Sequence, residues 1–171
     1  MKTILFSVLI ALSFSFMSLS NDGDKIPAAT LKKLDGSKIN SNTFSNNGKP
    51  IIISFWATWC KPCKKELDAI AENYPEWVKE TGVKLIAISI DDARSSGKVV
   101  TDVKTKGWEY EVYIDENQDF KRAMNVNNVP HTFIVDGEGK IVWSHNSYAD
   151  GDEDKLYENI QALVKGEKLK H

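Results

Sequence analysis

The segment IIISFWATWCKPCKKE, residues 51–66, decides the fold class. Its first six residues are β-branched, aromatic or small, which is typical of a strand that a sheet buries on both faces. From Cys60 onward the apolar positions recur at three- and four-residue steps, at 63, 67, 70, 71 and 74, which predicts a helix closed by Pro75. A hydrophobic strand therefore leads directly into a helix, with two cysteines at the junction.

Cys60 and Cys63 are the only cysteines in the chain. A disulfide across so short a loop restricts the unfolded chain very little, so a structural staple explains the spacing poorly. Unpaired backbone N–H groups and the positive end of the dipole favour a thiolate at the first turn of a helix. We therefore expect Cys60, with Lys61 beside it, to titrate below a free thiol and to attack, whereas Cys63 is more buried.

A zinc site is the alternative explanation of this spacing, since such sites also use cysteines two residues apart. Zinc needs four protein ligands, or three and a water molecule. The chain offers two cysteines and three histidines, at 131, 145 and 171, but no second cysteine pair. The strand-to-helix context therefore favours redox chemistry and no metal.

The remainder of the chain alternates strands with helices. The turn residues and hydrophobic periods predict a hairpin over 31–39, strands over 83–90, 111–114, 132–135 and 140–145, and helices over 95–106, 118–124 and 151–165. This order predicts an α/β fold in which a mixed central sheet is flanked by helices. No internal repeat or domain-sized linker interrupts it.

The N-terminal residues have the layout of a targeting segment. Residues 3–19 are almost wholly apolar or serine, follow Lys2 and precede a polar stretch, which predicts a signal peptide over residues 1–20. An uncleaved N-terminal membrane anchor is the alternative, at the short limit for crossing a bilayer. We expect an exported protein, periplasmic or tethered to the outer face of the cytoplasmic membrane, with one domain over residues 26–168.

The charge balance argues against a nucleic-acid-binding protein. The chain has 22 Lys plus Arg and 24 Asp plus Glu, a formal charge of −2. Because no basic run is interleaved with aromatic residues, the electrostatic pattern of nucleic-acid binding is absent from the sequence.

Together with residues 129–136, VPHTFIVD, the segment 51–66 resembles the thioredoxin-like thiol-disulfide oxidoreductases. More closely, the chain resembles the extracytoplasmic ResA and TlpA group within the AhpC/TSA and Redoxin superfamily. The resemblance extends from residue 26 to about residue 165. It implies a thioredoxin fold with an N-terminal β-hairpin and an inserted strand and helix at 111–124.

The resemblance also implies a substrate-binding element and a set of partners. In this group a cis peptide bond, here Val129-Pro130, presents the backbone of Val129 to a substrate peptide, as an added strand would be bound. Disulfide-containing proteins such as apocytochrome c are the implied substrates, and a membrane thiol carrier is the implied electron donor. No cofactor is implied, and we expect a monomer.

Two positions differ from thioredoxin itself. Ser54 stands where plain thioredoxin carries a buried carboxylate, six residues before Cys60. Glu66, three residues after Cys63, matches a glutamate that the ResA group places near its active site, which is possible because residues three apart on a helix are neighbours. The alternative is an ordinary solvated glutamate among the neighbouring charges.

Several aromatic residues and one histidine lie near the cysteines in sequence or by resemblance. We expect Trp56 and Trp59 to flank the site and form a hydrophobic docking surface, and Trp77, Trp108 and Trp143 to pack in the interior. His131, directly after Pro130, either influences the Cys60 thiolate or serves as a packing or surface residue.

We therefore expect an enzyme that exchanges two electrons. The Cys60 thiolate attacks a target disulfide, and Cys63 then resolves the mixed disulfide. Because only Lys61 and Pro62 separate the cysteines, with no histidine, we expect a reductant. The alternatives are a peroxiredoxin-type thiol peroxidase, which also uses an activated cysteine, and a redox-inert or metal-binding interaction module.

Overall fold

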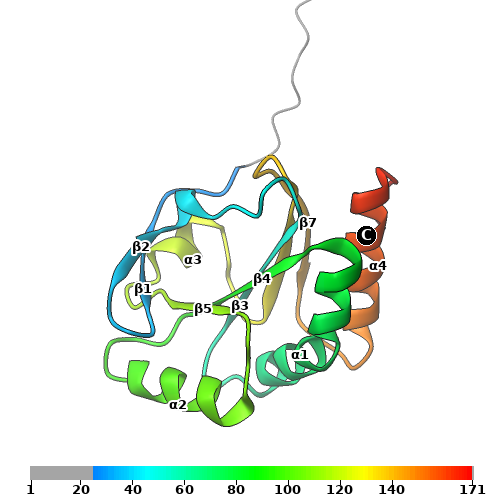
Figure 1. Cartoon of the computed structure of the whole chain (residues 1–171). Coiled ribbons are helices and arrows are strands. Elements are labelled where there is room, and N and C mark those ends of the chain that lie inside the picture. The colour runs from blue at the N-terminus through cyan, green and yellow to red at the C-terminus, as the bar shows by residue number, and fades with distance from the viewer. Residues whose placement is uncertain (1–24, 171) are drawn as a thin grey trace, which may run out of the picture.

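The structure, a computed structural model, describes residues 25–170, so the predicted targeting segment over residues 1–20 lies outside the described residues. These residues form seven strands, four α-helices and one 3₁₀ turn (Figure 1). The strands are β1 (Thr30–Lys33), β2 (Lys38–Asn40), β3 (Ile51–Trp56), β4 (Lys84–Ser89), β5 (Glu111–Ile114), β6 (His131–Val135) and β7 (Ile141–Asn146). The helices are α1 (Lys61–Thr81), α2 (Ser96–Lys106), α3 (Asp119–Ala123) and α4 (Asp152–Lys165), with the 3₁₀ turn at Ser41–Thr43.

All seven strands belong to one mixed sheet in the order β2-β1-β5-β4-β3-β6-β7. Strands β3, β4 and β5 are parallel, whereas β6, β7, β1 and β2 pair with their neighbours in the antiparallel sense. Every residue of β3 is buried, as its β-branched, aromatic and small residues predict. The predicted fold class, with its entry hairpin and its inserted β5 and α3, is confirmed.

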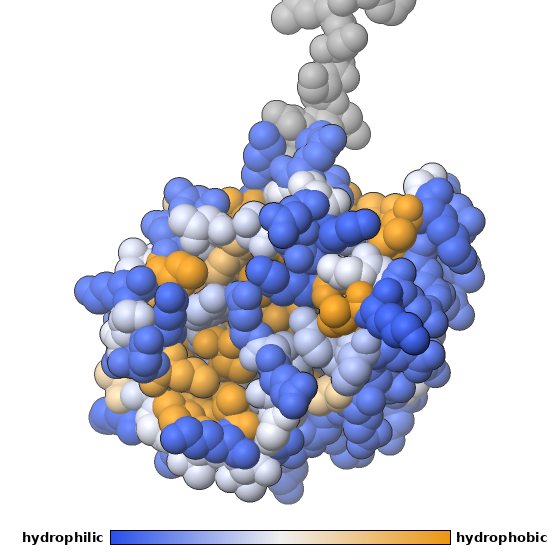
Figure 2. Space-filling view, in the orientation of Figure 1, coloured by the Kyte–Doolittle hydropathy of each residue, from blue (hydrophilic) through white to orange (hydrophobic). Residues whose placement is uncertain are grey.

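Helices cover both faces of this sheet. The connections β3-α1-β4 and β4-α2-β5 step in the same direction, and because such crossovers are right-handed, α1 and α2 lie on one face. Adjacent strand residues point to opposite faces. Trp56 accordingly packs against Trp108, which follows α2, while Phe55 packs against Phe120 of α3 on the other face. Hydrophilic residues cover most of the face drawn in Figure 2, where apolar residues gather in separate patches.

The prediction that Pro75 closes the first helix is wrong. Helix α1 continues through Pro75 to Thr81 and ends at Gly82, whose φ of 68° gives the left-handed cap that glycine adopts without strain. Proline lacks an N–H group and bends a helix, and α1 changes direction along its length in Figure 1. Packing offsets this cost, because Trp77 beyond the proline is 4% exposed and stacks on Tyr157 of α4, with ring centroids 4.7 Å apart.

We predict that Trp77→Ala lowers the free energy of unfolding by about 3–5 kcal/mol, the usual cost of truncating a buried tryptophan. The neighbouring Val78 is 40% exposed, so Val78→Ala should change stability by no more than about 0.5 kcal/mol. Urea unfolding of both variants measures the difference. Equal losses would show that the second half of α1 does not depend on its contact with α4.

Candidate active site

Cys60 and Cys63 lie at the junction between the end of β3 and the start of α1. A turn closed by the hydrogen bond from Cys60 N to Ala57 O, 3.0 Å long, separates the strand from the helix. Cys60 is the N-cap residue of α1 and forms a disulfide with Cys63. In this oxidised form Cys60 is 4% exposed and Cys63 is fully buried, which is the predicted order.

The first turn of α1 provides a backbone donor to the Cys60 sulfur. The N–H group of Cys63 donates to Cys60 Sγ over 3.3 Å, the capping bond that a serine or aspartate oxygen makes at other helices. Pro62 occupies the first turn, where no helical partner for its missing N–H is required. This arrangement favours negative charge on Cys60 Sγ once the disulfide is reduced.

The segment that leads into β6 also lies close to the Cys60 sulfur. The Val129-Pro130 peptide bond is cis, which confirms that prediction. Because β6 runs antiparallel to β3, its first residues lie beside the last residues of β3. The carbonyl oxygen of Val129 lies 3.8 Å from Cys60 Sγ. A peptide backbone paired with Val129 would therefore lie close to Cys60 Sγ.

Glu66 is buried, with 4% of its surface exposed, so the solvated-glutamate alternative is wrong. The Thr132 hydroxyl donates to Glu66 Oε1 over 2.7 Å, and Ser54 Oγ lies 3.4 Å from Glu66 Oε2. Burial raises the pKa of Glu66 to about 7. The hydroxyls of Thr132 and Ser54 lower this pKa, whereas the negative charges of Asp152 and Glu153 raise it further. The carboxylate missing from position 54 is thus supplied from α1, and it can exchange a proton near neutral pH.

The two tryptophans next to the cysteines lie in different environments. Trp59 is 68% exposed, whereas Trp56 is fully buried against Trp108 at a centroid distance of 5.1 Å. The expectation that Trp56 contributes to a docking surface is wrong. Its position in β3 directs its side chain into the interior, on the face of the sheet that α1 and α2 cover. Trp77 and Trp143 pack in the interior as predicted.

His131 lies in β6 and stacks on Phe133, with ring centroids 4.3 Å apart. Its Nδ1 atom is 3.4 Å from the side-chain amide nitrogen of Asn146. Burial, and then the neighbouring His145, hold the pKa of His131 below its usual value. These contacts agree with the packing alternative for this residue.

Asp91, which sequence reasoning missed, anchors the loop that precedes Cys60. Its carboxylate is 2% exposed and accepts hydrogen bonds from the Thr58 backbone N–H, over 2.8 Å, and the Thr58 hydroxyl, over 2.7 Å. The Ser89 hydroxyl donates to the same carboxylate over 2.8 Å. A carboxylate directly after a buried strand was the only signal in the sequence, since Asp91 and Thr58 are 33 positions apart.

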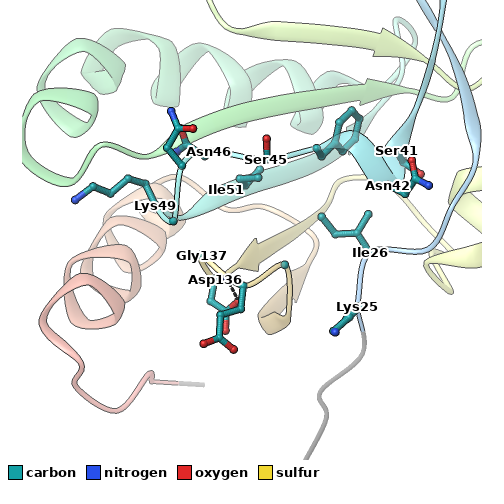
Figure 3. A pocket seen from close by; sticks show the side chains of 15 residues that line it. Lys25, Ile26, Ser41, Asn42, Ser45, Asn46, Lys49, Ile51, Asp136 and Gly137 are labelled. Atoms are coloured by element: carbon teal, nitrogen blue, oxygen red, sulfur yellow. Dashed lines mark hydrogen bonds between the residues drawn. The ribbon is translucent and has the colours of Figure 1, made fainter.

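A cavity of about 450 Å³ lies away from the cysteines. It is lined mainly by polar loop residues near the start of β3 and the end of β6, including Asn46, Lys49 and Asp136, together with Ile51 at the start of β3 (Figure 3). Cys60 follows the opposite end of β3. A groove of about 370 Å³ next to Trp59 is closer to the disulfide.

Residues 25–170 contain neither a cluster of candidate metal ligands nor a helix suited to crossing a membrane. No three His, Cys, Asp or Glu side chains come together there as ligands of a metal ion. No helix among residues 25–170 is both long and apolar enough to cross a membrane.

Comparisons with known proteins agree with this geometry. Residues 23–144 match the sequence profile described as the AhpC/TSA family. The chain belongs to this family. It is 35% identical over 120 residues to the thiol-disulfide oxidoreductase ResA of Bacillus thuringiensis, an alignment that covers 70% of this chain and 66% of that relative, just under two thirds.

Two other similar proteins cover a larger share of the chain. The thiol:disulfide interchange protein DsbE of Haemophilus influenzae is 32% identical over 136 residues, which cover 79% of this chain and 70% of DsbE. The solution structure of a thioredoxin-like protein from Porphyromonas gingivalis superposes with a TM-score of 0.76 at 50% identity, covering 88% of this chain and 99% of the other. The chain thus has the thioredoxin-like fold of a solved structure to which it is 50% identical.

We predict that Glu66 makes stability fall with increasing pH. The folded state binds the Glu66 proton more tightly than the unfolded chain does. The stabilisation from this proton is therefore complete below 4.5, the ordinary pKa of a glutamate, and is lost as the pH rises through the folded-state pKa of about 7. Glu66→Gln, which resembles the protonated form, should lack this loss, on the order of 3 kcal/mol. Urea unfolding of the oxidised proteins from pH 4 to pH 8 measures it. Glu72→Gln, an exposed change on the same helix, should follow the wild type, whereas parallel curves for all three proteins would contradict the prediction.

We predict that Asp91→Ala destabilises the protein by at least about 2 kcal/mol, because it leaves the buried Ser89 hydroxyl and two half-buried donors of Thr58 without their acceptor. Amide exchange at residues 57–60 should accelerate at the same time. Asp92→Ala is the matched control, since Asp92 is 43% exposed and pairs with Arg94 on the surface. Similar exchange at residues 57–60 in both variants would show that Asp91 does not hold this loop.

Proposed function

We propose that this chain is an extracytoplasmic thiol-disulfide oxidoreductase that reduces disulfides in other proteins. The observation that carries the proposal is the Cys60-Cys63 disulfide at the N-terminus of α1, with the carbonyl of Val129 3.8 Å from Cys60 Sγ. Cys60 is the attacking residue because its sulfur caps the helix and accepts from the Cys63 N–H. Trp59, Val129 and Pro130 form the surface that receives the substrate.

The reaction transfers two electrons from the reduced cysteine pair to the substrate disulfide. The Cys60 thiolate attacks one substrate sulfur and forms a mixed disulfide, and the substrate's other sulfur leaves as a thiolate. Cys63 passes its proton to the Glu66 carboxylate and attacks Cys60 Sγ, which breaks the mixed disulfide and releases the second substrate thiolate. The substrate is then a dithiol after protonation, and the enzyme is the disulfide of the present structure.

Glu66 suits the proton transfer on two grounds. It lies three residues after Cys63, on the next turn of α1, and both side chains are buried. Its pKa of about 7 allows it to hold or release a proton at neutral pH. A carboxylate with an ordinary pKa would remain ionised there and accept the Cys63 proton less readily.

The direction of exchange and the partners form the finer part of the proposal. Lys61 and Pro62 between the cysteines, and the resemblance to the ResA group, support a reducing enzyme. A membrane thiol carrier would return electrons to Cys60-Cys63, and apocytochrome c is a candidate substrate. The segment over residues 1–20 supports an extracytoplasmic location, either periplasmic or tethered to the cytoplasmic membrane.

We predict that Cys63→Ser accumulates mixed disulfides with its partners, because no internal thiol remains to resolve them. The exported variant is quenched with acid, alkylated and separated on non-reducing gels. Reductant-sensitive adducts should appear, and their second component identifies the substrate or the donor. Cys60→Ser is the matched control and should give few or none.

Adducts that form through Cys60→Ser instead would reverse the roles of the two cysteines. Absence of adducts from both variants would contradict an oxidoreductase. Turnover of hydrogen peroxide by Cys63→Ser would instead favour the thiol peroxidase alternative, since that chemistry needs only the attacking cysteine.

A further inference from the structure

A groove borders the disulfide on the side away from Val129. It is formed by Thr58 and Trp59 before Cys60, by Lys64 in the first turn of α1, and by one flank of α2. Its volume, about 370 Å³, is at the lower end of the range for ligand pockets, about 300–1,000 Å³. Space of this size accepts a short piece of chain with its side chains.

Trp59 is the exposed apolar wall of this groove. It is 68% exposed, more than Val78 and Val164, the other large exposed apolar residues of the described chain. Its indole makes no hydrogen bond or ring contact with any residue between 25 and 170. The backbone beneath it is nevertheless held, because the adjacent Thr58 is bound to Asp91 through both its N–H and its hydroxyl. Trp59 therefore offers an unpaired aromatic face, held on a fixed backbone, to a segment bound in the groove, and tryptophan is one of the residues that most often contribute strongly to binding.

The opposite wall, on α2, is open and carries Lys98 and Asp102; with Lys64 on α1, the groove has two cations and one anion. At Gly97 an added Cβ would meet no atom within 4 Å, so the wall has free space there. Lys98 makes no ion pair within the described residues, whereas the groove's other lysine, Lys64, is paired with Asp102 at 3.5 Å. The groove therefore has an uncompensated cation about one helical turn from Asp102, and it favours an acidic side chain.

The strand order places this groove and the cis peptide bond on opposite sides of Cys60. Strand β6, which begins after Pro130, pairs with one edge of β3, and β4, which leads to α2, pairs with the other. A substrate segment bound to Val129 can therefore continue past Cys60 Sγ into the groove.

We propose that the groove between Trp59 and α2 is a specificity site, which selects substrate segments with an apolar residue and an acidic residue close to the attacked cysteine. The apolar side chain packs on Trp59, and the carboxylate pairs with Lys98. This inference rests on the proposed function, since it assigns the kind of protein disulfide that the Cys60-Cys63 pair reduces.

The experiment uses three disulfide peptides that differ at one position. Each has leucine next to the attacked cysteine and Glu, Gln or Lys one residue further on. The reduced full-length protein is mixed with each peptide, and kcat/KM is measured by acid quench and chromatography. At low ionic strength the Glu peptide should react about fivefold faster than the Lys peptide, with the Gln peptide between them, and high salt should reduce this preference.

Charge reversal tests the assignment to Lys98. Lys98→Glu should reverse the preference so that the Lys peptide reacts faster. Lys104→Glu is the matched control: it makes the same charge change on an exposed position of α2 outside the groove, and it should keep the wild-type preference. Trp59→Ala should slow the leucine peptides more than peptides with serine in the leucine position.

The outcomes separate this inference from the proposed function. Equal rates for the three peptides, or an equal preference in Lys98→Glu and the wild type, would overturn the specificity site while exchange itself stands. A wild-type protein that reduces none of the peptides would overturn both.

Discussion

Burial of β3 on both faces is the constraint on which the remaining structure depends. A strand with no exposed residue needs a hydrogen-bonded neighbour along each edge and a layer of side chains above and below. Its neighbours are β4, in the parallel sense, and β6, in the antiparallel sense. The carboxyl end of β3 therefore meets the end of β4 and the beginning of β6. This single point brings together Asp91, Cys60 and the cis Val129-Pro130 bond.

Two buried carboxylates near this point are stabilised in different ways. Asp91 accepts three hydrogen bonds and holds the loop before Cys60 in place. Glu66 has the Thr132 and Ser54 hydroxyls beside it, which do not offset the cost of its burial, so its pKa rises to about 7. Asp91 fixes the position of the loop before Cys60, whereas Glu66 can take up or release a proton near neutral pH.

The two surfaces beside the disulfide differ in the groups that they offer to a bound peptide. On one side the Val129 carbonyl offers a main-chain contact, which is independent of the substrate's sequence. On the other side Trp59 and Lys98 offer side-chain contacts, which depend on that sequence.

The amino-acid sequence by itself determined the strand and helix around Cys60, the mixed sheet and the cysteine chemistry, because these follow from local periodicity and from the properties of a helix N-terminus. The sequence-based prediction was wrong at Pro75. Proline usually ends a helix, but here the contact between Trp77 of α1 and Tyr157 of α4 stabilises the turns beyond it. The burial of the Glu66 side chain and the anchoring role of Asp91 were decided only by the tertiary structure. Each depends on a partner far away in the chain, such as Thr132 for Glu66, 66 positions on, and no local pattern records which distant side chains a fold brings into contact.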